Sequence, residues 1–193
     1  MKMKTLTGLL AASALFASGA AMAEPFYINV NAFDTTPLGG TDGLTANISQ
    51  VGINWNATSV FTDDQGAAGI DAGDSVLDSG NGTFSSYLDA GANAISGGEN
   101  NEGVGVTHQL LFSYNDLAGK VVLNDGAGGI LAKYTSGTIT VRNDNNVDGD
   151  TADAGEGEVL RLNVFDSTGT IGNLIIFATV DLAGTAANTW FFP

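Results

Sequence analysis

Acidic and amide side chains alternate around a glycine in residues 144–156, an arrangement that suits a hard cation. Asp144, Asn146, Asp148 and Gly149 match the D-x-[DN]-x-[DN]-G spacing of calcium loops, in which oxygens face inward and the glycine permits a sharp turn. Calcium takes about six to eight oxygen ligands. We therefore predict a calcium site with these ligands: Asp144, Asn146, Asp148, Asp150, Asp153 and Glu156.

The end of this segment departs from the EF-hand pattern. The twelfth position holds Gly155 instead of glutamate, and Glu156 follows one residue later. Asp153 can close the shell instead, as in shorter acidic calcium loops between strands. A solvated turn in which Asp and Asn cap their own backbone remains the alternative. Residues 63–74 form a second acidic, glycine-punctuated segment, for which a calcium loop and a plain acidic hairpin both remain open.

Signatures of catalysis are missing from the chain. It contains no cysteine and no G-x-S-x-G elbow, and His108 is its single histidine. We predict a protein that is not an enzyme. Four large aromatic residues suit either a platform for sugar rings, as in a carbohydrate-binding module, or packing in the core. They are Trp55, Tyr87, Tyr114 and Trp190.

The N-terminus has the three parts of an export signal. Lys2 and Lys4 precede an apolar stretch, and Ala21-Met22-Ala23 forms a cleavage site, so residues 1–23 are predicted to be removed before Glu24. The apolar stretch is too short for a membrane span. Loss of the two lysines lowers the formal net charge from −15 to −17. This charge disfavours nucleic acid and anionic lipid, and favours cations as partners.

Turn residues separate short β-branched and aromatic segments along the mature chain. Their spacing predicts an all-β fold, an antiparallel β-sandwich of jelly-roll or Ig-like type, as a single domain over residues 24–193. The predicted strands include 46–55, 75–77, 83–88, 108–114, 119–123, 130–134, 137–142, 158–165 and 174–182. The continuously apolar run 174–180 predicts a central strand covered on both faces. Residues 89–105 predict a long surface loop.

Several motifs together resemble one bacterial family. They are the Pro-Phe-Tyr-Ile-Asn-Val run after Glu24, Leu-Leu-Phe-Ser-Tyr after Gln109, Thr-Ser-Gly-Thr-Ile after Tyr134, and the Asp-Asn-Asn and Asp-Ala-Gly-Glu elements of residues 144–156. This combination, spread over most of the mature chain, resembles the flocculation-associated PEP-CTERM family of secreted proteins. The resemblance implies a non-enzymatic floc-matrix or biofilm protein of a Gram-negative bacterium, held at the cell surface among extracellular polysaccharides.

The chain departs from this family at its C-terminus. The family carries a Pro-Glu-Pro motif, an apolar segment and a basic tail, none of which precedes Pro193. The sequence also stops on the apolar residues 190–193. We predict that the domain is truncated at its C-terminus; a member of the family that is simply released is the alternative.

Overall fold

All regular elements in the described part of the chain are β-strands. The computed structural model describes residues 3–6, 27–28, 47–66, 68–95, 109–144, 146–149, 156–181 and 191–192. The strands are β1 (Met3–Leu6), β2 (Tyr27–Ile28), β3 (Gln50–Thr62), β4 (Ser75–Leu88), β5 (Gln109–Asn124), β6 (Ile130–Asp144), β7 (Gly157–Thr170), β8 (Asn173–Val180) and β9 (Phe191–Phe192). No helix long and apolar enough to cross a membrane occurs among these residues. The predicted all-β class is confirmed.

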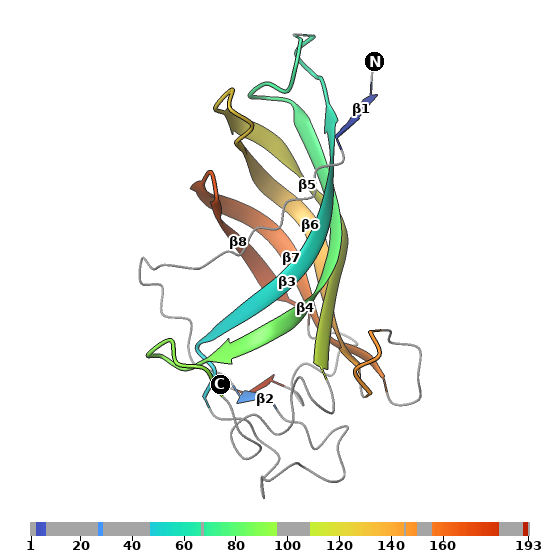
Figure 1. Cartoon of the computed structure of the whole chain (residues 1–193). Coiled ribbons are helices and arrows are strands. Elements are labelled where there is room, and N and C mark those ends of the chain that lie inside the picture. Colours follow the sequence, from blue (N-terminus) through green and yellow to red (C-terminus); the bar gives the residue numbers. More distant parts are fainter. Residues whose placement is uncertain are drawn as a thin grey trace, which may run out of the picture.

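Seven of the strands form one antiparallel sheet with the order β1-β3-β4-β5-β6-β7-β8. From β3 to β8, each strand lies beside its neighbour in the sequence, and the sheet is strongly twisted and curved (Figure 1). The strands β2 and β9 form a separate antiparallel pair. A jelly-roll or Ig-like sandwich contains Greek-key connections between two facing sheets. This finer prediction is not established by the described strands and stays a prediction.

Three strands are much longer than predicted. Each of β4, β5 and β6 joins two of the predicted strands into one strand of 14 to 16 residues. Glycine, asparagine and aspartate in the middle of these strands indicated turns, but they lie at β-bulges, for example between Asp78 and Gly80 and between Tyr114 and Ala118. A bulge bends a strand without ending it, so turn-forming residues can lie inside a continuous strand.

The prediction of a central strand at 174–180 is wrong. Among the described strands, β8 lies at the edge of the sheet beside β7, and its exposure alternates along the sequence. Ile175 and Phe177 are 46% and 42% exposed, whereas Ile176 and Ala178 pack against the core. A continuous apolar run is typical of a strand buried on both faces. In β8 only the side chains of one face are packed within the described part of the protein.

Aromatic rings lie over glycines on the inner face of the sheet, the face that carries the buried core. Gly80 and Gly82 of β4 stand opposite Tyr114 and Phe112 of β5. A Cβ atom on Gly80 would lie 2.7 Å from the Tyr114 hydroxyl, and one on Gly82 would lie 2.9 Å from the Phe112 ring. The rings therefore fill the space that the two glycines leave.

The core contains thirteen buried apolar residues, which belong to the described strands and to Ile48 just before β3. They are Ile48, Phe61, Val76, Tyr87, Leu110, Phe112, Tyr114, Leu117, Val121, Tyr134, Val141, Val159 and Val164.

Gly80→Ala is expected to destabilise the fold. Its Cβ would lie 2.6 Å from the backbone oxygen of Asn56 as well as against Tyr114, so both the strand pairing and the ring must shift. We expect a loss of about 1–3 kcal/mol in the free energy of unfolding, measured by urea titration. Gly157→Ala is the matched control, because a Cβ there meets nothing within 4 Å. Equal stability of the two variants would contradict this account of the packing.

Candidate functional site

The carboxylate of Asp144 is the buried anchor of the predicted calcium segment. Asp144 is the last residue of β6 and is fully buried. Its Oδ1 accepts hydrogen bonds from the backbone N–H groups of Asn146 at 3.2 Å and Val147 at 2.7 Å. Its Oδ2 accepts from the backbone N–H of Gly149 at 2.9 Å and from Gln109 Nε2 at 2.8 Å. Since a carboxylate has about four lone-pair sites, these four donors occupy it.

The electrostatics of Asp144 agree with this role. Burial acts to raise the pKa of Asp144, but the hydrogen bonds from Gln109 and from the backbone of the loop outweigh it, so the pKa lies below its ordinary value. The ionised carboxylate therefore holds the turn together, as in the capping alternative of the sequence analysis. A cation bound to Asp144 would share oxygens that the loop already uses.

The remaining predicted ligands are divided between described and undescribed residues. Asn146 and Asp148 are exposed, and Asn146 Nδ2 donates to Asp148 Oδ2 at 3.1 Å. Glu156 is partly buried just before β7, while Asp150 and Asp153 lie outside the described residues. Val147 and Gly149 adopt positive φ angles of 59° and 91°. Such an angle is unusual for a β-branched residue such as Val147, so the turn is held in a strained shape.

The second acidic segment, between β3 and β4, is built on the same principle. Asp74 is almost completely buried, and its two oxygens accept the backbone N–H groups of Asp64 at 3.0 Å and Asp71 at 2.8 Å. Asp64 in turn forms a salt bridge with Lys120 of β5 at 2.7 Å. These contacts fit the plain acidic hairpin that the sequence left open. Among the described residues, no group of three or more His, Cys, Asp or Glu side chains could hold a metal ion.

A buried carboxyl group that the sequence analysis missed lies in the core. Asp78 of β4 is 8% exposed, and Tyr134 of β6 donates its hydroxyl to Asp78 Oδ2. Within the described residues, Asp78 Oδ1 has no hydrogen-bond partner. In the sequence, Asp78 looks like a turn residue because Gly80 and Asn81 follow it. Val76 and Asp78 are two residues apart and so share one face of a strand. This spacing was the one signal in the sequence that could have predicted the burial of Asp78.

The environment of Asp78 favours the protonated acid. Burial raises the pKa of Asp78, although the hydroxyls of Tyr134 and Ser59 act to lower it. Burial, followed by the nearby charge of Asp78, also raises the pKa of Tyr134 and of Tyr114. The cluster therefore resists ionisation of every member, as expected for titratable groups in a low-dielectric core.

Three of the four large aromatic residues are described, and these three pack in or against the core. Tyr87 and Tyr114 are buried, and Trp55 is packed against the core with its ring centroid 6.4 Å from that of Tyr114. Trp190 and His108 lie outside the described residues. No exposed ring among Trp55, Tyr87 and Tyr114 forms the flat surface that a carbohydrate-binding module requires.

Comparisons with protein-family models, with curated proteins and with solved structures found no match.

Asp78→Asn is expected to change the pH dependence of stability. Because folding raises the pKa of Asp78, its proton stabilises the folded state at pH values below the unfolded carboxyl pKa of about 3.9, and this contribution is lost as pH rises through the folded pKa. Asparagine cannot ionise. The stability of Asp78→Asn relative to wild type should therefore increase from pH 4 upward, as measured by urea unfolding.

Asp89→Asn provides a control of opposite sign. Hydrogen bonds from Asn93 lower the pKa of Asp89. The ionised Asp89 therefore contributes to the free energy of unfolding at neutral pH, and this contribution is lost as pH falls through the folded pKa.

A stability profile of Asp78→Asn that runs parallel to that of wild type between pH 4 and 8 would show that Asp78 is not held protonated by the core.

Proposed function

We propose that this protein is an exported, non-enzymatic matrix protein that promotes cohesion of bacterial cells in flocs or biofilms, with calcium bound by its acidic connections. Its partners would be calcium ions and anionic extracellular polysaccharides. The proposed location is outside the cell or on the surface of a Gram-negative bacterium. The formal charge of −15 and the resemblance to floc-matrix proteins support this proposal.

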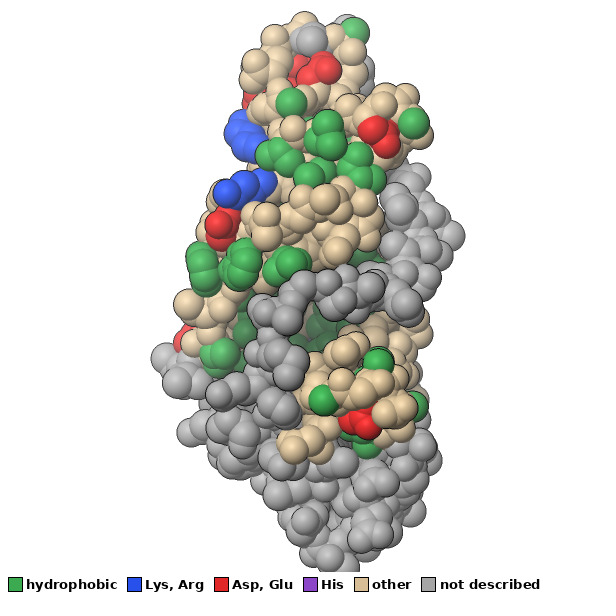
Figure 2. Space-filling model, turned by 90° about the vertical axis from the view of Figure 1, so that its left-hand side faces the viewer, with side chains coloured by type: hydrophobic (Ala, Val, Ile, Leu, Met, Phe, Trp, Pro, Cys, Tyr) green, Lys and Arg blue, Asp and Glu red, His purple; other side chains and the backbone are tan. Residues whose placement is uncertain are grey.

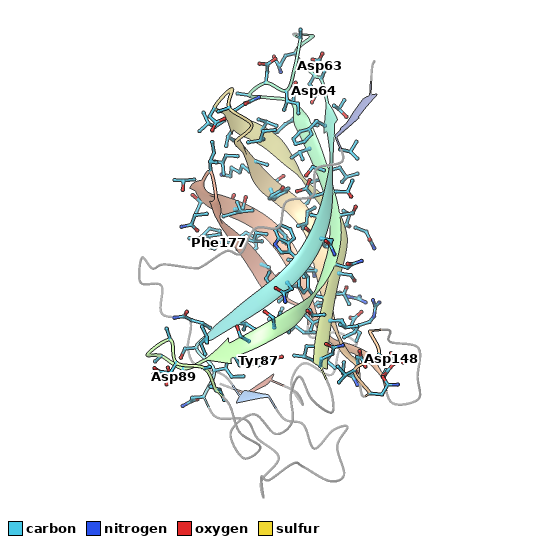
Figure 3. All side chains as sticks on the ribbon, viewed as in Figure 1. Asp63, Asp64, Tyr87, Asp89, Asp148 and Phe177 are labelled. Carbon is cyan, nitrogen blue, oxygen red and sulfur yellow. The ribbon has the colours of Figure 1, made fainter. Side chains whose placement is uncertain are left out.

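The observation that carries the proposal is the placement of acidic turns at both ends of one long sheet. Asp63 and Asp64 lie at one end of the strands, and Asp89 and Asp148 lie at the opposite end (Figure 3). Strand β5 has 16 residues, and at about 3.3 Å per residue a strand of that length spans roughly 50 Å. One molecule thus presents carboxylates at two well-separated ends, which suits a cross-linker of anionic polymers through divalent cations.

The charge of the protein explains why cations would be required. A chain with 21 acidic and 6 basic residues repels other copies of itself and acidic polysaccharides at low ionic strength. Calcium bound at the connections would neutralise part of this charge and bridge to carboxylates of the polymer. Extracellular calcium sites function with dissociation constants as weak as about 10⁻⁴–10⁻³ M, so a partly exposed site is sufficient.

Export is the second part of the proposal. Removal of residues 1–23 would also remove β1, which pairs with β3 in the full chain, from Met3 opposite Thr62 to Leu6 opposite Ser59. The mature sheet would then begin with β3. With no cysteine in the chain, no disulfide can brace the exported protein. A ligand that binds only the folded state stabilises it by mass action, and calcium could supply this stabilisation.

Calcium is expected to raise the melting temperature of the protein. A measurement by circular dichroism should give a higher value in millimolar calcium than in EDTA, and Asp148→Ala should remove most of this difference because an exposed predicted ligand is lost. Asp144→Ala should lower the melting temperature in EDTA as well, since four N–H donors lose their acceptor.

Asp125→Ala is the matched control for this measurement. Asp125 also caps its own turn, by accepting the N–H groups of Ala127 and Gly129, but it lies outside both predicted calcium segments. Its variant should keep the full calcium effect. A melting temperature of wild type that is identical in EDTA and calcium would rule out the proposed site.

The cohesive function is expected to appear as bridging of anionic polymer. We expect the protein to cluster beads coated with carboxymethyl dextran in millimolar calcium, followed by turbidity, and EDTA to disperse the clusters. Calcium without protein and protein without calcium are the controls. Clustering that does not depend on the protein, or none at all, would refute the proposed function.

A further inference from the structure

The two ends of the described strand order differ in what lies there. At one end is β8, on the side of the molecule that Figure 2 views, where hydrophobic side chains appear at the surface. At the other end, β3 pairs with the short strand β1 over its last four residues, from Ser59 opposite Leu6 to Thr62 opposite Met3. Figure 1 shows β1 beside the upper end of β3. The segment that covers this part of β3 is therefore the start of the same chain.

Strand β3 is a favourable acceptor for a further strand. Its 13-residue sequence, QVGINWNATSVFT, has no charged residue and no proline. Natural sheets discourage pairing at an edge with charges, proline or very short strands, and β3 has none of these features. Because N–H and C=O directions alternate along an antiparallel strand, half of these groups in residues 59–62 point away from β4. In the full chain, β1 is the described strand that meets them.

Strand β1 suits this position by its length and its charge. It has four residues, MKTL, and short edge strands that carry lysine are a common protection of natural sheets. The first four residues of the chain include Lys2 and Lys4, two of its 6 basic residues. The paired end of β3 is followed directly by Asp63 and Asp64, which lie at this end of the sheet (Figure 3). Asp64 forms its salt bridge with Lys120, whereas Asp63 is exposed, so a basic segment is attracted to this end.

The residues of β1 also begin the predicted export signal. Lys2 and Lys4 form its basic part, and the apolar stretch and the cleavage site at residues 21–23 follow in the sequence. A segment of this kind binds an anionic membrane through its lysines and its apolar side chains. Residues 3–6 cannot be a strand of the sheet and lie at a membrane surface at the same time. Pairing with β3 and use of the signal therefore exclude each other.

We propose that the β3 edge masks the export signal of the full chain by holding Met3–Leu6 as an edge strand. The contact is autoinhibitory: the chain engages a membrane before the sheet folds or when β1 is released, and the folded full chain does not. Removal of residues 1–23 ends this competition. The inference rests on the export part of the proposed function and requires neither calcium nor polysaccharide. A strand of four residues forms few hydrogen bonds, so the contact is weak and reversible.

Cysteine cross-linking of the full chain in EDTA tests the pairing. The chain has no cysteine, so Thr5→Cys combined with Val60→Cys introduces a single pair of thiols. Thr5 and Val60 are opposite in the register, so their Cα atoms lie about 4.5–5.5 Å apart, within the range of a disulfide. Thr5→Cys combined with Leu77→Cys is the matched control, because Leu77 faces Val60 from β4 and lies one strand further from β1. Mild oxidation should link the first pair and leave the second reduced.

Binding to vesicles of phosphatidylglycerol and phosphatidylethanolamine tests the masking. The folded full chain should bind them weakly in EDTA, and Thr5→Pro combined with Leu6→Pro should lower the apparent dissociation constant about tenfold or more, because the masked form no longer competes. Since N–H directions alternate along a strand, one of the two prolines removes an N–H that points to β3. Thr5→Ala combined with Leu6→Ala is the matched control, because it keeps both N–H groups and should bind like wild type. Circular dichroism checks that each variant is folded.

The outcomes separate the masked signal from the matrix function. Equal cross-linking of the two cysteine pairs overturns the pairing of β1 with β3. Equal vesicle binding by wild type and the proline variant, at any strength, overturns the masking, even when calcium-dependent bead clustering is observed. The expected cross-link and vesicle results without bead clustering support the masked signal and refute the matrix function.

Discussion

Hydrogen bonds from backbone N–H groups to buried carboxylates fix the described turns at the ends of the long strands. Asp74 and Asp144 lie next to strand ends, and each accepts backbone donors from described residues of the adjacent connection. In a chain without cysteine, these contacts take the place of covalent links at the ends of the strands. Unlike a disulfide, a carboxylate needs to stay ionised to accept all of its donors. Because hydrogen bonds lower the pKa of Asp144, the turn at residues 144–149 is linked to pH and to any cation that competes for the same oxygens.

In the proposed calcium site, the same acidic segment would both accept backbone N–H groups and bind a cation. Asp144 already uses its oxygens within the loop, whereas Asn146 and Asp148 are exposed at its tip. A cation site that leaves the inner carboxylate to the backbone and recruits the outer side chains would be shallow and weak. Weak binding is adequate outside the cell, where calcium is abundant. A shallow site also leaves coordination positions free for a carboxylate of a polymer, which a closed EF-hand shell would not.

The sequence predicted the class of fold and most strand positions because alternating apolar residues and turn residues are local signals. It did not predict that β4 and β5 run through Gly80 and Tyr114, since a bulge and a turn use the same residue types and differ only in their partner strand. The buried position of Asp78 was missed for the same reason. The edge position of β8 was missed because apolar composition indicates that a strand needs cover, but not whether that cover comes from its own chain. For the predicted calcium ligands, spacing singled out the segment that Asp144 begins, and three of the four donors to Asp144 are backbone N–H groups close by in the sequence. The fourth donor, Gln109, is 35 residues away and gives no local signal.

The acidic connections lie at the ends of the strands (Figure 3), so cation bridges would extend an assembly along the strand direction. Calcium bridges between exposed charges weaken as monovalent salt screens them. A molecule with acidic connections at both ends can contact two polymer chains. Individually weak contacts are then sufficient for cohesion, because many of them act on the same polymer at once.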